Sequence, residues 1–145
     1  MQKNVLLIIG FLLFWFTLDM TGFSIGSFNL VESAIPVEMI DVVWWFLFVV
    51  CFLFFIKKEN YGKYALLIFL IIWGFIQYPM YFTRKGESLE SYNNFFLNTH
   101  HIINPSNDFL IKDTYHIVLD ILIAVSFIGV AIFIIHSSKI GRKTN

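Results

Sequence analysis

The chain has 145 residues, of which 58% are hydrophobic and only 14% are charged. A soluble domain averages nearer one half apolar and one quarter charged, so this composition excludes a cytosolic enzyme, a nucleic-acid binder and a disordered tail. Ten basic and ten acidic residues cancel, and the single cysteine, Cys51, excludes an internal disulfide and paired-thiol redox chemistry. We therefore predict an integral membrane protein in contact with the lipid bilayer.

Four apolar stretches are long enough to cross a hydrocarbon core of about 30 Å, at a helical rise of about 1.5 Å per residue. We predict membrane-spanning helices over residues 3–21, 37–56, 64–82 and 114–136. No segment alternates as a barrel strand does, so helices are the only structure that satisfies the backbone in lipid. The predicted fold is an all-α membrane protein, with residues 1–145 forming a single four-helix up-down transmembrane bundle.

The first apolar stretch has a second interpretation, because Lys3 before an apolar run also fits a secretory signal peptide. The residues after the run, 19–22, contain no small-x-small cleavage site. We favour an uncleaved first span.

Basic residues are segregated along the chain, which predicts the orientation. Seven of them fall on one side of the four-span arrangement: Lys3, Lys57, Lys58, Lys63, Lys139, Arg142 and Lys143. The other side carries Arg84, Lys85 and Lys112, together with eight of the ten acidic residues. By the positive-inside rule both termini are cytoplasmic, in a cell membrane. The Phe, Ile, Asn and Lys bias is typical of a low-GC bacterium.

The two outer loops differ in pattern. Residues 19–35 are rich in Gly and Ser and predict an irregular segment, whereas residues 84–113 contain a periodic apolar series. That series consists of Leu89, Tyr92, Phe96 and Ile103. Its spacing predicts an interfacial helix in the headgroup plane, with an ordinary loop as the alternative.

Polar residues within the spans are the best functional clue, because a charge at the bilayer centre costs about 2.5–3.5 kcal/mol on insertion scales. Here they all fall in the outer half: Thr17, Asp19, Glu38, Asp41, Gln77, Tyr78, Tyr81, His116 and Asp120. We predict an outward-facing polar cup above an apolar plug. His100 and His101 of the second outer loop are placed to fold over its opening.

Two sets of acidic and histidine side chains share helix faces in this cup. Asp113, His116 and Asp120 follow i, i+3, i+7 spacing, and Glu38 and Asp41 follow i, i+3 spacing. Such residues on facing helices are the ligands of bundle metal sites, so all five are candidate ligands of a divalent metal. His116 and Asp120 are also the candidates for general acid–base catalysis.

Structural roles account for most of these residues equally well. Asp113 suits a helix N-cap, and Glu38 and Asp41 suit the first turns of a helix, where carboxylates favour the dipole. His116 can pair with Asp120, and Gln77 can satisfy backbone groups that Pro79 frees. Asp120 lies about 9 Å inside its span, so capping does not explain it.

Two functions are consistent with this pattern. The first is a non-enzymatic accessory (an immunity, assembly or transport partner) that binds a membrane protein or forms a homo-oligomer. The second is a membrane-embedded enzyme or a metal- or lipid-binding protein that uses the polar cup around His116 and Asp120. The weak motifs favour the accessory.

Overall fold

The computed structural model describes residues 2–34 and 39–141. Glu38, a candidate metal ligand, lies outside these ranges. Most of the chain is helical, and four helices are long and apolar enough to cross a membrane. They are α1 (Gln2–Thr21), α2 (Met39–Lys57), α3 (Glu59–Gln77) with its continuation α4 (Met80–Thr83), and α6 (Thr114–Gly141).

These helices expose apolar side chains around most of their circumference. In the most apolar window of α2, only 11% of the residues are buried inside the protein. Large apolar side chains are also exposed on the other helices, for example Leu7 on α1 and Phe75 on α3, as Phe46 is on α2. A helix that is apolar all round and still exposed suits lipid rather than water. By length and composition, all four helices are therefore suited to cross a membrane.

The observed helices lie where hydropathy predicts them, with two differences at their ends. α3 begins at Glu59, five residues before the predicted start at 64, so Lys63 is in a helix and not in a loop. The helix is interrupted after Gln77, because Pro79 has no backbone N–H, and α4 then continues the same apolar stretch. α6 runs to Gly141, beyond the predicted end at 136.

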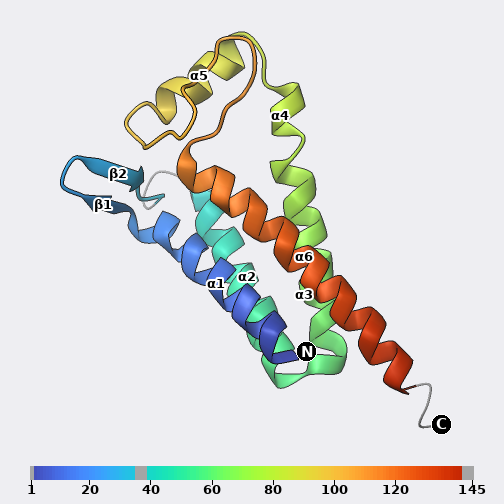
Figure 1. Cartoon of the computed structure of the whole chain (residues 1–145). Coiled ribbons are helices and arrows are strands. Elements are labelled where there is room, and N and C mark those ends of the chain that lie inside the picture. Colours follow the sequence, from blue (N-terminus) through green and yellow to red (C-terminus); the bar gives the residue numbers. More distant parts are fainter. Residues whose placement is uncertain (1, 35–38, 142–145) are drawn as a thin grey trace.

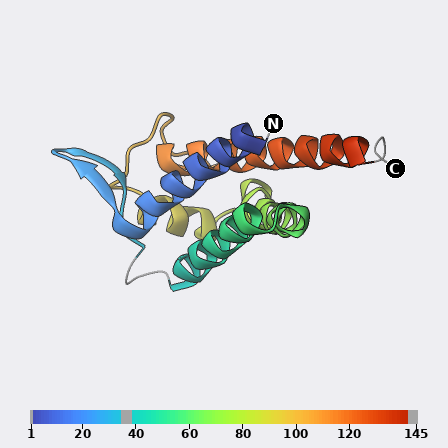
Figure 2. The ribbon, with the colours of Figure 1, turned by 90° about the horizontal axis from the view of Figure 1, so that it is seen from below.

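The four long helices pack in a ring in which α1 contacts α2 and α6, and α3 also contacts α2 and α6 (Figures 1 and 2). Two indole N–H groups link α1 to its neighbours. Trp15 donates to the carbonyl of Tyr115 on α6 at 3.1 Å, and Trp45 on α2 donates to the Thr17 hydroxyl at 3.0 Å. These tryptophans therefore join helices, in addition to any interfacial role.

One end of the ring carries a folded extension that we call the head, comprising residues 22–34 and 84–113 (Figure 1). Its first part is a β-hairpin of β1 (Phe23–Ile25) and β2 (Phe28–Val31), joined at Gly26, which has a φ of +60°. The prediction of an irregular segment is therefore wrong here. Gly26-Ser27 between two apolar-alternating runs is a hairpin signal, because Gly adopts positive φ without strain.

The second part of the head contains α5 (Glu87–Phe95), which confirms a helix in this loop. Leu89 and Tyr92 on α5 are buried against Leu110, and Phe96 packs against this small core. The predicted series fails at Ile103, which lies outside the helix and is 57% exposed. Helical spacing therefore continues only to Phe96.

The hairpin between α2 and α3 is tight, because α3 follows α2 after the single residue Lys58. A Cβ on Gly62 would lie 2.6 Å from the carbonyl oxygen of Phe54 and even closer to the backbone of Phe55. Backbone cannot swing aside as a side chain can, so this crossing requires glycine.

We expect Gly62→Ala to destabilise the protein by about 1–3 kcal/mol or more, as overpacking does. Gly10→Ala is the matched control, because nothing lies within 4 Å of a Cβ at that position on α1. Thermal unfolding in detergent measures both variants. Equal midpoints for the two would contradict the close α2–α3 approach.

Candidate functional site

The strongest polar interaction at the head end of the bundle is a buried ion pair. Lys112 Nζ lies 2.8 Å from Asp120 Oδ2, and the lysine and aspartate side chains are 0% and 7% exposed. Lys112 precedes α6 in the head, whereas Asp120 lies two turns inside α6. The pair therefore ties the head to the wall of the bundle.

Residues of α3 and α4 add hydrogen bonds to Asp120 Oδ2 and Lys112, whereas Asp120 Oδ1 is buried without a protein partner among the described residues. The Tyr81 hydroxyl donates to Asp120 Oδ2 at 2.7 Å, and Lys112 Nζ also donates to Gln77 Oε1 at 3.0 Å. Tyr78, near Pro79, donates to the backbone carbonyl of Asp120 at 2.7 Å. Gln77 therefore serves the lysine, in addition to any role beside the proline.

His116 has a different partner from the one that its i, i+4 spacing to Asp120 suggests. Asp113 Oδ1 accepts hydrogen bonds from the backbone N–H of His116 at 2.9 Å and from its Nδ1 at 2.6 Å. Asp113 directly precedes α6, so the first bond is the N-cap interaction expected for this residue. The structure thus divides the predicted triad into two pairs, Asp113–His116 and Lys112–Asp120.

The two loop histidines connect segments of the head and do not meet as a pair of ligands. His100 donates its backbone N–H to Asn29 of β2 at 2.6 Å, and its Nδ1 lies 2.7 Å from the Thr114 hydroxyl. His101 Nε2 lies 2.9 Å from the carbonyl of Phe96. His100 therefore connects β2 to the start of α6, and His101 is bonded to the residue that follows α5.

A polar cavity of about 320 Å³ lies between the head and the ends of the long helices. Seven of the residues around it have polar or charged side chains: Asp19 on α1, Asp41 on α2, Gln77 on α3, Arg84 directly after α4, Ser91 and Tyr92 on α5, and His116 on α6. Asp19, Asp41 and His116 also line an adjoining space of about 90 Å³ beneath β2. A polar cavity thus exists at this end of the bundle, and Asp120 is held beside it rather than among its lining residues.

Over residues 2–34 and 39–141, no group of three or more His, Cys, Asp and Glu side chains is arranged to hold a metal ion. Of the candidate ligands, Asp113 and Asp120 are engaged by His116 and Lys112 respectively. Asp41 and His116 line the same cavity. Among the described residues, the candidate ligands therefore form pairs with other side chains and do not form a group of three or more metal ligands.

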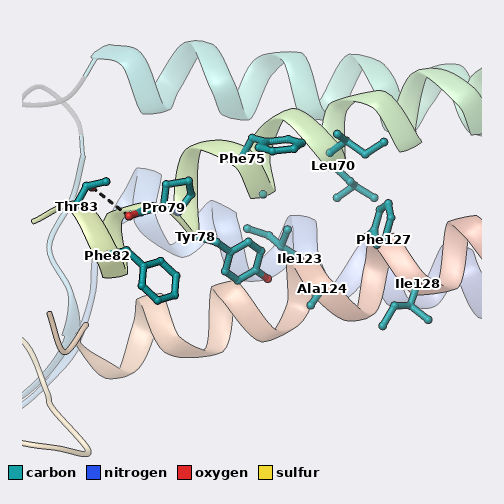
Figure 3. A pocket seen from close by; sticks show the side chains of 12 residues that line it. Leu70, Phe75, Tyr78, Pro79, Phe82, Thr83, Ile123, Ala124, Phe127 and Ile128 are labelled. Atoms are coloured by element: carbon teal, nitrogen blue, oxygen red, sulfur yellow. Dashed lines mark hydrogen bonds between the residues drawn. The ribbon is translucent and has the colours of Figure 1, made fainter. Parts of the chain in front are cut away.

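An apolar groove of about 660 Å³ runs between α3–α4 and α6, along helices that are long and apolar enough to cross a membrane. Figure 3 shows Phe75 and Phe82 on one wall, Phe127 and Ile128 on the other, and Tyr78 between them. The Tyr78 hydroxyl is turned toward α6, where it bonds the Asp120 carbonyl. The groove presents mainly hydrocarbon and aromatic surface, and the Tyr78 and Thr83 hydroxyls that line it donate to the carbonyls of Asp120 and Pro79.

Sequence reasoning missed Lys112, which we counted only among the outer loop charges. A signal was present, because a carboxylate deep in a span requires a cationic partner. The predicted outer side contains three lysine or arginine residues, Arg84, Lys85 and Lys112. Of these, Lys112 is nearest to Asp120 in the sequence. Burial lowers the pKa of the Lys112 ammonium, and the Asp120 carboxylate opposes that effect.

We expect Lys112→Met to destabilise the protein by about 3–5 kcal/mol, because it leaves the Asp120 carboxylate buried without its counter-charge. The double variant Lys112→Met/Asp120→Asn should recover most of this loss, since it removes both charges and keeps an oxygen for Tyr81. A double-mutant cycle from unfolding in detergent measures the coupling. Lys85→Met, at an exposed lysine of the head, is the control and should change stability little. Additive single-variant effects would contradict the pairing.

The Asp113–His116 pair should make stability depend on pH. Burial raises the pKa of Asp113, but hydrogen bonds from His116 outweigh it, so the pKa lies below its ordinary value. The native state then binds this proton more weakly than the unfolded chain, and the stabilisation is complete above about pH 4 and lost on further acidification.

We therefore expect Asp113→Asn to lower the free energy of unfolding at pH 7 by about 1.5–3 kcal/mol, the contribution of a hydrogen bond to a charged group. The deficit should shrink as the pH falls below about 4. Urea unfolding of the detergent-solubilised protein across pH 3–7 measures it. Asp108→Asn, at an exposed aspartate of the same loop, should show no such trend. A deficit that persists unchanged at pH 3 would rule out the charged Asp113–His116 interaction.

The chain matches no protein-family model, no curated protein and no solved structure.

Proposed function

We propose that this protein is a non-enzymatic bacterial accessory of the cell membrane, with an up-down four-span bundle, both termini in the cytoplasm and the head outside. Its head is the recognition element for a membrane-protein partner, in the manner of an immunity, assembly or transport-partner protein. The observation that carries this proposal is the buried Lys112–Asp120 pair, which holds the head on the bundle.

The use of the polar groups supports an accessory over an enzyme. Asp120 Oδ2 accepts from both Lys112 and Tyr81, and Asp113 Oδ1 binds His116. A general acid or base must reach a proton of its substrate, so a carboxylate oxygen that two donors already occupy is poorly placed for that work. The arrangement suits stability better than turnover.

The surface of the head supports partner binding. Several large apolar side chains there are exposed although they lie outside the four long helices: Phe23, Ile25, Phe28, Phe95, Leu97, Ile102, Ile103 and Phe109. Apolar surface of this kind outside the spans marks contact with a protein or with the membrane surface. A head that is held firmly in place presents this surface at lower entropic cost on binding.

We expect a photoreactive amino acid at Phe28 or Leu97 to form one discrete crosslinked product in native membranes. The matched position is Tyr61, which is 72% exposed at the opposite end of the bundle and should not give that product. In a Lys112→Met background the head loses its ion pair with Asp120 of α6, and most of the crosslinked product should disappear. A product at twice the mass of the chain identifies the partner as a second copy.

Two results would contradict the proposal. One is crosslinking from Tyr61 that equals crosslinking from the head, and the other is a head that forms no protein adduct at any of its exposed apolar positions.

A further inference from the structure

Two hydrogen-bond donors on the wall of the polar cavity have no protein partner within the described part of the chain. They are the Tyr92 hydroxyl and Arg84 Nε, both of which are buried. Tyr92 is 8% exposed, and the Arg84 guanidinium carbon lies 4.9 Å from the centroid of its ring. Leaving a buried donor unpaired costs about 1–3 kcal/mol, so two neighbouring donors of this kind require an explanation.

A guanidinium and a hydroxyl that lie next to each other are suited to an oxyanion, because charge-assisted bonds from arginine are the strong ones. The other hydrogen bonds of Arg84 are long, and one of their two acceptors, the Met80 sulfur, is weak. Its Nη1 donates to the Ser88 carbonyl at 3.4 Å, and its Nη2 points to the Met80 sulfur at 3.7 Å. Arg84, a residue that lines the cavity, therefore has a buried Nε without a protein partner among the described residues and only long bonds from its Nη atoms.

The same cavity also carries negative charge from other helices. Asp19 at the end of α1 and Asp41 in the first turn of α2 both line it, and carboxylates favour an ammonium group. The rest of the wall contains the polar residues Gln77, Ser91 and His116 together with apolar or aromatic residues, which include Phe16, Trp73, Ile76, Phe95 and Leu119. A volume of about 320 Å³ is near the lower limit for small-molecule sites, which are about 300–1,000 Å³.

We propose that this cavity binds a small zwitterion that has an ammonium group, an oxyanion and an adjacent apolar part. Arg84 and Tyr92 receive the oxyanion, and Asp19 and Asp41 receive the ammonium. A free amino acid with an apolar side chain and a zwitterionic lipid headgroup both have this chemistry. Of the exposed apolar residues proposed above to bind a partner, this cavity shares Phe95, whereas the crosslinking positions Phe28 and Leu97 are not among its lining residues.

The test uses full-length protein in nanodiscs of phosphatidylglycerol, which contain no zwitterionic lipid. Calorimetry compares L-phenylalanine with N-acetyl-L-phenylalanine, which lacks the ammonium, and with L-phenylalaninamide, which lacks the carboxylate. A parallel arm compares glycerophosphoethanolamine with glycerophosphate. We expect one zwitterion to bind saturably and at least about tenfold more tightly than its truncated analogues, which corresponds to about 1.4 kcal/mol. Binding in the first arm identifies a free amino acid, and binding in the second identifies a lipid headgroup.

Variants separate a binding role from a structural one. Tyr92→Phe removes only the unpartnered hydroxyl, so it should weaken zwitterion binding about tenfold while leaving the unfolding temperature unchanged or higher. Arg84→Met should abolish the preference for the oxyanion, whereas Lys85→Met, at the exposed neighbour, should retain wild-type affinity. Asp41→Asn should abolish the preference for the ammonium, with Glu87→Gln as its control.

Three outcomes would overturn the proposal: no saturable binding of either zwitterion, truncated analogues that bind as tightly as the intact ones, or wild-type affinity in both Tyr92→Phe and Arg84→Met. Because the crosslinking positions Phe28 and Leu97 do not line the cavity, failure of these measurements leaves the crosslinking result independent.

Discussion

Asp120 is a carboxylate two turns inside an apolar helix, and the arrangement around it follows from the need to neutralise its charge. Its counter-ion, Lys112, comes from the head and not from a facing helix, and Tyr81 adds a hydrogen bond from α4. Desolvating each ion costs several kcal/mol, which a close pair with further hydrogen bonds offsets. The position of the head is therefore coupled to a charge within the bundle.

A second polar contact, between α3 and α6, lies at the opposite end of the bundle. Lys63 on α3 is 6% exposed and donates to the Ser137 hydroxyl of α6 at 2.8 Å. This contact brings one charge to a neutral hydroxyl, whereas the contact at the head end brings two opposite charges together. Helix α3 with its continuation α4 is thus bonded to α6 near both ends, by Tyr78 and Tyr81 at the head end and by Lys63 at the other, and the apolar groove lies between the same helices.

The ion pair also determines which side chains remain for binding. Asp120 is bonded by Lys112 and Tyr81, and Lys112 also bonds Gln77. These polar side chains therefore stabilise the fold. The cavity beside the ion pair is then lined by groups of both signs, with Arg84 from one side and Asp19 from another. A structural network and a binding cavity can share one end of a small bundle because they use different residues.

The sequence by itself determined the features that depend on local pattern. Hydropathy over about 20 residues located the four long helices, the spacing from Leu89 to Phe96 indicated α5, and the position of Asp113 before α6 indicated its capping role. The hairpin around Gly26 was also readable locally and was missed. Only the tertiary structure decided that Asp120 pairs with Lys112, and His116 with Asp113. Tyr78 and Asp120 are 42 residues apart, and Gln77 and Lys112 are 35 apart, so their contacts depend on how helices and head pack. Helical periodicity describes one helix face at a time, and it carries no information about which side chain another segment brings to that face.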